Sequence, residues 1–141
     1  MITDTPRKIE RRQSPRYQLK QPVDVVLDNG NHLNVESRNI SSSGLQISCD
    51  SWATNEIEPR GIQSHVVRGL RFKIIMALKL EDDTKKLYTN CRVISVQRLS
   101  QDEYMLSLSF IEFENGSENI LEKFLSQFQQ TNVVHKGVVG E

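Results

Sequence analysis

Six stretches of alternating apolar and polar residues make up most of the middle of the chain. Their apolar members are Val23, Val25 and Leu27; Leu33 and Val35; Leu45, Ile47 and Cys49; Phe72, Ile74, Met76, Leu78 and Leu80; residues within 87–98; and Tyr104, Leu106, Leu108 and Phe110. A period of two puts alternate side chains on one face of a strand, so each stretch predicts a half-buried β-strand. Asn29-Gly30, between the first two, is a strong signal for a tight hairpin turn. Because closing a sheet removes its exposed edges, six consecutive strands predict a mainly β fold, a six-stranded antiparallel β-barrel.

Two regions depart from this alternation. The phase changes within 87–98, which indicates a β-bulge near Ile94. Residues 50–70 mix glycine, proline and polar residues, and they predict a long loop with room for a short helical turn. Trp52 in this loop is expected to have a structural role at an open end of the barrel, with stacking on a ligand as the alternative.

One helix is predicted after the last strand. Ser117 is a residue type that caps helix N-termini, and Glu118 suits the positive end of the helix dipole. Apolar residues then recur at helical spacing, at Ile120, Leu121, Phe124, Leu125 and Phe128. This stripe predicts a C-terminal α-helix that covers the mouth of the barrel, and 131–141 is expected to be a flexible tail.

The size and charge of the chain limit what it can bind. With 141 residues it fits one domain with a single core, predicted to span 11–130. Its 18 basic and 18 acidic side chains balance, which argues against a protein that coats DNA or RNA. No apolar run reaches membrane-spanning length, and the first residues lack the apolar region of a signal peptide. These features predict a soluble cytoplasmic protein without membrane insertion.

The residues that usually carry metal or covalent chemistry are few and scattered. Cys49 and Cys91 are too few and too far apart for a disulfide framework or a zinc site, and they are predicted to be reduced core residues. His32, His65 and His135 show no metal-ligand spacing, and no Ser, Cys or carboxylate has the context of a nucleophile. The chain is therefore not expected to be an enzyme, or to carry a metal or a cofactor.

Basic residues are concentrated at the start of the chain. The first 20 residues contain Arg7, Lys8, Arg11, Arg12, Arg16 and Lys20 against only Asp4 and Glu10. Residues 1–10 are expected to be a flexible basic arm, since they have little apolar surface to bury. Pro15 stiffens the chain just before the first strand, so it restricts how the arginines beside it enter the fold.

Two motifs carry chemistry suited to a small, doubly charged anion. The first is Arg12-Gln13-Ser14-Pro15-Arg16, preceded by Arg11, and the second is Asn39-Ile40-Ser41-Ser42-Ser43-Gly44. The guanidinium fork matches phosphate oxygens and also the O6/N7 edge of guanine. A segment with three arginines is therefore suited to hold a guanine nucleotide.

The second motif is expected at the turn between the second and third strands. If the strand continues to Ser41, the side chains of Asn39 and Ser41 share one face, where they can hydrogen-bond a base edge or a phosphate. Gly44 admits backbone conformations that other residues avoid, and it lets a ligand approach the main chain. The alternative is a turn in which the Asn and Ser side chains satisfy their own backbone.

The order and spacing of the two motifs resemble the PilZ domain family. The family pattern is R-x-x-x-R before the first strand and [D/N]-x-S-x-x-G between the second and third, and the strand and helix order fits over roughly residues 10–128. The resemblance implies a receptor for the bacterial second messenger cyclic di-GMP. It places phosphate and guanine contacts on Arg12 and Arg16, and contacts to the other side of a guanine on Asn39, Ser41 and Gly44.

The resemblance also carries expectations about stoichiometry and output. Arg11, just before the first motif, implies two intercalated, stacked ligand molecules rather than one. Ligand binding is expected to order the arm against the barrel and to create a surface for an unidentified effector protein. The 50–70 loop is longer than is typical of the family.

Two other functions fit parts of the sequence. Some domains of this fold act as ligand-independent protein-interaction adaptors, although every motif residue is present here. A small nucleic-acid-binding barrel of the OB type would need exposed aromatic residues among basic ones, whereas Phe72, Tyr104, Phe110 and Phe124 follow the periodicity of the core. A test of binding to cyclic di-GMP distinguishes the adaptor, and salt-sensitive binding to oligonucleotides distinguishes the OB-type barrel.

Overall fold

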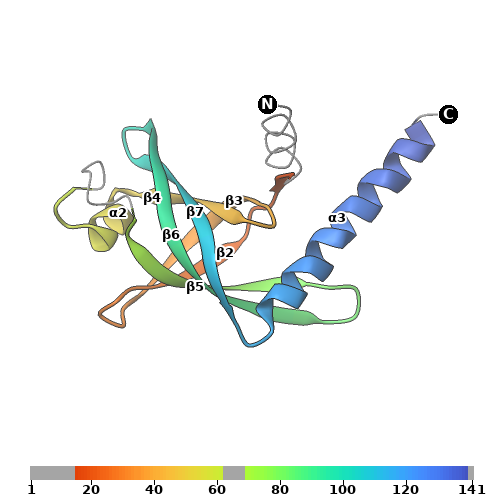
Figure 1. Cartoon of the computed structure of the whole chain (residues 1–141). Coiled ribbons are helices and arrows are strands. Elements are labelled where there is room, and N and C mark those ends of the chain that lie inside the picture. The colour runs from red at the N-terminus through yellow and green to blue at the C-terminus, as the bar shows by residue number, and fades with distance from the viewer. Residues whose placement is uncertain (1–14, 62–68, 140–141) are drawn as a thin grey trace, which may run out of the picture.

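The computed structural model describes residues 15–61 and 69–139, and the side chains of 15–61 and 69–128. Its strands are β1 (Tyr17–Gln18), β2 (Pro22–Val26), β3 (His32–Ile40), β4 (Gly44–Asp50), β5 (Arg71–Lys79), β6 (Thr84–Ser100) and β7 (Glu103–Glu114), and its helices are α2 (Ser51–Ile57) and α3 (Ser117–Val139). Figure 1 shows the strands wound around one another, with α2 and α3 at opposite ends of the barrel.

The six longer strands close into a ring. Hydrogen-bonded neighbours follow the order β3, β2, β5, β6, β7 and β4, and β4 pairs back to β3, with every pairing antiparallel. The predicted six-stranded antiparallel β-barrel with a C-terminal helix is therefore confirmed. The Asn29-Gly30 turn also forms, since Gly30 has a φ of +88° and the Asn31 N–H donates to Asn29 Oδ1 at 2.9 Å.

Alternation along the strands fills the barrel with apolar side chains. On β5, for example, every second residue from Phe72 to Leu78 is buried. Cys49 and Cys91 are buried free thiols, as predicted. Burial raises the pKa of each to about 12, so both thiols are protonated at neutral pH.

The β-bulge predicted within residues 87–98 lies in β6. The register of β6 against β7 shifts between Val93 and Ser95, so the bulge predicted near Ile94 is confirmed. The extra residue turns the Ile94 side chain outward, where 42% of its surface is exposed.

Part of the predicted 50–70 loop is the helix α2, which begins directly after β4. The Asp50 carboxylate caps it by accepting the Ala53 N–H at 2.8 Å, and the Asp102 carboxylate accepts the Ser51 N–H at 3.1 Å. The Ala53 side of the helix is buried, which leaves Trp52 on the outer side with 64% of its surface exposed. The expected packing role of Trp52 is therefore wrong.

The C-terminal helix α3 begins as predicted but is not capped as predicted. Ser117 is fully buried, and its hydroxyl accepts the Tyr88 N–H of β6 at 2.8 Å instead of capping the helix. The predicted apolar stripe packs on β5, β6 and β7, with Leu121, Phe124 and Leu125 buried. The helix continues to Val139, through most of the segment 131–141 that was expected to be a flexible tail, and no proline in that part interrupts its hydrogen bonds. None of the described helices is long and apolar enough to cross a bilayer.

Candidate ligand-binding site

The strap is the segment Pro15–Gln21, which leads into the barrel. β1 within it pairs with the same side of β3 as β2 does, at Tyr17–Ile40 and Gln18–Asn39. Ser37 of β3 spans the break between β1 and β2: its hydroxyl donates to the Leu19 carbonyl and accepts the Gln21 N–H at 3.1 Å. These bonds attach the strap to the strand that carries the second motif.

An aromatic contact also fixes the strap. The ring of Tyr17 stacks on Phe128 of α3 with a centroid distance of 4.9 Å and an interplanar angle of 15°. Phe128 in turn meets the buried Phe124 edge-on at 5.1 Å. Aromatic pairs of this kind are worth about 0.5–1.5 kcal/mol beyond the area they bury.

A bulge in β3 brings Asn39 to the outer surface of the barrel. The register against β4 shifts between Ser37 and Asn39, so Ser37 and Ile40 both point inward, with Arg38 exposed and Asn39 half-buried between them. Regular alternation from Ser37 would have turned Asn39 into the core. The bulge therefore makes the first residue of the second motif available beside the strap.

Arg16 of the first motif contacts Asn39 of the second. Arg16 Nη1 donates to Asn39 Oδ1 at 3.0 Å, across 23 positions of sequence, and this hydrogen bond is exposed to solvent. Arg11, Arg12 and the predicted arm 1–10 lie outside the described residues. The described part of the chain thus joins the two motifs through one guanidinium and one side-chain amide.

The other end of the Asn39 amide is bound as well. Asn39 Nδ2 donates to Gln46 Oε1 of β4, and Gln46 Nε2 donates to Ser107 Oγ of β7 at 2.9 Å. Gln46 and Ser107 were not predicted as part of the site. The signal that identifies them is the strand register, which places Asn39 opposite Gln46 and Gln46 opposite Ser107.

Ser41 has a different environment from that expected of a ligand-facing hydroxyl. It is buried, and its Oγ accepts the N–H groups of Ser43 and Gly44, each at 3.2 Å. The Ser41 N–H donates to the Gly44 carbonyl at 2.9 Å and completes the turn. This is the turn-stabilising interpretation of the motif, in which Ser41 shapes the backbone next to Asn39.

Gly44 is required for space. Its φ is not positive, so the expected conformational freedom is not used. A Cβ at this position would lie 2.2 Å from the Leu108 carbonyl oxygen of β7. The close approach that a glycine permits is therefore made by a neighbouring strand of the same barrel.

A hollow of about 440 Å³ lies beside the strap and Asn39. It is lined by Gln18, Leu19, Lys20, Glu36, Ser37, Arg38, Asn39, Ser48 and Glu103. Arg38 donates to Ser48 Oγ at 3.1 Å and lies 3.6 Å from a Glu103 carboxylate oxygen, so its charge is partly neutralised. Lys20 also lines the hollow, where Glu36 and Glu103 balance it and Arg38 in charge. Arg16, bonded to Asn39 outside this lining, adds a positive charge that favours an anion next to Asn39.

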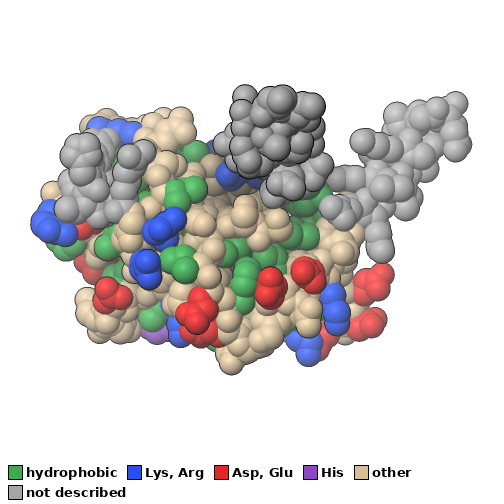
Figure 2. All heavy atoms as spheres, in the orientation of Figure 1, with side chains coloured by type: hydrophobic (Ala, Val, Ile, Leu, Met, Phe, Trp, Pro, Cys, Tyr) green, Lys and Arg blue, Asp and Glu red, His purple; other side chains and the backbone are tan. Residues whose placement is uncertain are grey.

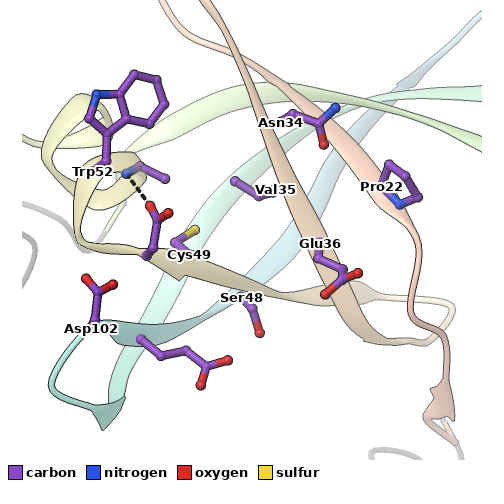
Figure 3. Close-up of a pocket in the computed structure, with 11 residues that line it drawn as sticks. Pro22, Asn34, Val35, Glu36, Ser48, Cys49, Trp52 and Asp102 are labelled. Atoms are coloured by element: carbon purple, nitrogen blue, oxygen red, sulfur yellow. Dashed lines mark hydrogen bonds between the residues drawn. The ribbon is translucent and has the colours of Figure 1, made fainter.

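A second hollow, of about 550 Å³, shares Glu36, Ser48 and Glu103 with the first. Figure 3 shows Trp52 on one side of it, with Glu36 and Asp102 around it. Hydrogen bonds from Ser51 hold the pKa of the Asp102 carboxyl below its usual value, so this carboxylate stays charged near neutral pH. Unlike the first hollow, this one has four acidic residues and no lysine or arginine in its lining, which makes it a poor site for an anion.

The described surface gives little support to a nucleic-acid-binding face or to a metal site. Figure 2 shows acidic and basic side chains scattered over the face in view, without one continuous basic patch. Within 15–61 and 69–128, no group of His, Cys, Asp and Glu side chains is arranged to hold a metal ion.

A model of the PilZ domain family matches residues 10–127. The chain belongs to the PilZ domain family. The match includes both motifs and reaches almost to the end of the apolar stripe of α3. PilZ domains are receptor or adaptor domains rather than enzymes.

Solved structures of other PilZ proteins have the same fold. The Bacillus subtilis inhibitor of motility (MotI/DgrA) is 19% identical with a TM-score of 0.64, over 86% of this chain and 52% of that one. The PilZ domain of YcgR from Escherichia coli, solved with c-di-GMP, is 15% identical with a TM-score of 0.58, over 89% of this chain and 98% of that one. The MrkH–c-di-GMP complex of K. pneumonia is 17% identical with a TM-score of 0.57, over 93% of this chain and 55% of that one. The chain thus spans about half the length of MotI/DgrA and MrkH, and no curated protein sequence matches it.

Proposed function

We propose that this PilZ domain is a receptor for cyclic di-GMP that binds its ligand between the strap and the outer face of β3 and β4. The observation that carries the proposal is the hydrogen bond between Arg16 Nη1 and Asn39 Oδ1, at 3.0 Å. This bond brings the guanidinium of Arg16, in the first motif, into contact with Asn39, the first residue of the second motif. YcgR and MrkH, which share the fold, have been solved with c-di-GMP, and this supports the same ligand class here.

The chemistry of the two motifs fits the ligand. Cyclic di-GMP carries two negative charges and two guanines, and a guanidinium fork binds either a phosphate or the O6/N7 edge of guanine. The Arg16–Asn39 bond has a charged donor but is exposed and has a neutral acceptor, so giving it up for a phosphate contact costs about 1.5 kcal/mol, the low end for charged groups. Asn39 therefore holds Arg16 near the proposed ligand site, and Arg16 can still leave Asn39 to bind a phosphate. Arg12 supplies the second guanidinium.

The proposal extends to stoichiometry and output. Arg11 adds a third guanidinium, which favours two intercalated ligand molecules, since stacked guanines and four phosphate charges need more cations than one ligand does. Binding orders the arm, residues 1–10, against the barrel and creates the surface that an effector protein recognises. Ser41 and Gly44 contribute by fixing the turn that holds Asn39 in place.

Titration calorimetry with cyclic di-GMP tests the receptor assignment. We expect Arg12→Ala and Arg16→Ala each to lose about 2–5 kcal/mol of binding free energy, roughly 30-fold or more in Kd. The matched control is Arg71→Ala, because Arg71 is also exposed but lies on β5, which is separated from β3 by β2. Unchanged affinity in the Arg16→Ala protein would refute the assignment. A wild-type protein that does not bind the ligand would leave the ligand-independent adaptor as the function.

A further inference from the structure

We propose that Gln46 is a positioning residue for the ligand site: its side-chain amide holds Asn39 so that the Asn39 carbonyl oxygen faces the strap. This inference rests on the proposed function, because the site in question is the cyclic di-GMP site. Gln46 belongs to neither motif, and it acts through Asn39.

Three side chains lie in one row across the outer face of the barrel. Asn39 of β3 is the register partner of Gln46 of β4, and Gln46 is the register partner of Ser107 of β7. Residues paired directly across neighbouring strands have side chains close enough to bond, and both pairs do so here. With Arg16 at its end, the row reads Arg16, Asn39, Gln46, Ser107.

The direction of the hydrogen bonds in this row gives Gln46 its role. An asparagine amide has an acceptor end and a donor end, and a guanidinium can only donate. Arg16 can therefore bond Asn39 only when Oδ1 faces the strap, and the amide then turns Nδ2 toward β4. Gln46 Oε1 accepts from Nδ2 and stabilises that orientation. Without this acceptor, β4 would no longer favour that orientation. A flipped Asn39 amide would then present its two N–H donors to Arg16.

Ser107 keeps the Gln46 amide in the row. Its hydroxyl is nearly buried, with 6% of the residue exposed, and it receives the Gln46 Nε2–H at 2.9 Å. The flanking residues Leu45 and Ile47 are fully buried and supply the core packing of this strand. Gln46 itself is half-buried on the outer surface, so replacing its amide leaves the core intact.

The same orientation suits the bound state. An outward Oδ1 is an acceptor, and it can take a hydrogen bond from a guanidinium or from the N2 amino group of a guanine. An outward Nδ2 would face those donors with another donor. Gln46 thus sets which kind of ligand group Asn39 accepts, without touching the ligand.

The test is a double-mutant cycle between Gln46→Leu and Asn39→Asp, read by calorimetry with cyclic di-GMP. Gln46→Leu alone should raise Kd about three- to tenfold, the loss expected when one neutral hydrogen bond no longer fixes an orientation. An aspartate at position 39 has acceptors at both ends, so it has no orientation to fix. In the Asn39→Asp background, Gln46→Leu should therefore change Kd less than about twofold.

Two further measurements separate positioning from a general structural role. Gln97→Leu is the matched control, because Gln97 is an exposed glutamine on β6 with no side-chain hydrogen bond among the described residues, and it should leave Kd unchanged. The ¹H–¹⁵N side-chain amide resonance of Asn39 should shift in ligand-free Gln46→Leu and not in Gln97→Leu.

Each outcome of the cycle decides a question. An unchanged Kd in Gln46→Leu, or an equal loss in both backgrounds, overturns the positioning role while leaving the receptor function in place. A wild-type protein that does not bind cyclic di-GMP overturns the proposed function and this inference with it. An unshifted Asn39 resonance in Gln46→Leu overturns the inference without reference to any ligand.

Discussion

Replacing Gly44 by alanine asks whether the glycine of the second motif provides space or conformational freedom. A Cβ at this position would lie 2.2 Å from the Leu108 carbonyl oxygen and 3.3 Å from the carbonyl carbon. Both atoms are backbone of β7, which pairs with every residue of β4, so no side chain can turn aside to relieve the contact. Relief of the contact requires the two strands to separate by about 0.8 Å, to reach the 3.0 Å limit below which such contacts essentially do not occur.

We expect Gly44→Ala to lower the free energy of unfolding by about 3 kcal/mol, the upper part of the range for overpacking, because main chain must move. Urea denaturation followed by far-UV circular dichroism measures this change. Gly30→Ala is the control: Gly30 has a φ of +88° and no atom within 4 Å of a built Cβ, so it should lose only the 1–2 kcal/mol or so of a left-handed backbone. A Gly44→Ala protein no less stable than Gly30→Ala would contradict the spatial argument.

Two other predictions concern the strap and the core. Tyr17→Ala should lower the free energy of unfolding by about 1–2 kcal/mol, because it removes the ring stacked on Phe128, and Tyr17→Phe should keep most of it. Equal losses in the two proteins by urea denaturation would show that the stack is not the cause. The folded-state pKa of Cys49 and Cys91 is raised to about 12 from an ordinary value of 9.0. Their contribution to stability is therefore full below pH 9 and falls as the pH rises from 9 toward 12, since only the unfolded thiols ionise there. A Cys49→Ala, Cys91→Ala double variant should show a shallower fall over that range, and an unchanged slope would be evidence against it.

The barrel could be predicted from the sequence because its strands follow a strict two-residue alternation. Phe72 to Leu78 is the clearest case, and the change of phase at Ile94 even located a bulge. Apolar alternation shows directly which side chains of a strand are buried, so a strand can be predicted without knowing its partner strand. The bulge in β3 beside Asn39 gave no such signal, since Arg38 and Asn39 are both polar.

The errors of prediction have a common physical cause. Trp52 was expected to pack, and Ser117 to cap α3, because of what their residue types usually do. In the structure the buried face of α2 is the one that carries Ala53, and the Ser117 hydroxyl is used by the Tyr88 N–H. Such choices depend on which neighbour a side chain meets across the fold, and local sequence does not contain that information.

The candidate site was predictable in its motifs and not in its supporting contacts. The resemblance of Arg16 and Asn39 to a family pattern named two residues that the structure brings to 3.0 Å. Gln46 and Ser107 could not be found in this way, because their place beside Asn39 depends on the register of three strands. Register follows from the turn at 41–43, which the sequence did predict, and from the bulge between Ser37 and Asn39, which is visible only in the folded chain.

The stack of Tyr17 on Phe128 has a practical consequence for anyone who shortens this protein. Tyr17, the residue next to Arg16, also supports the long C-terminal helix α3 through this stack. Trimming the chain at the beginning of the barrel would therefore remove a motif arginine and loosen the opposite terminus in one step. Loss of a downstream response in such a shortened protein could then come from either end of the molecule, and only point substitutions at Arg16 and Tyr17, made separately, can tell the two causes apart.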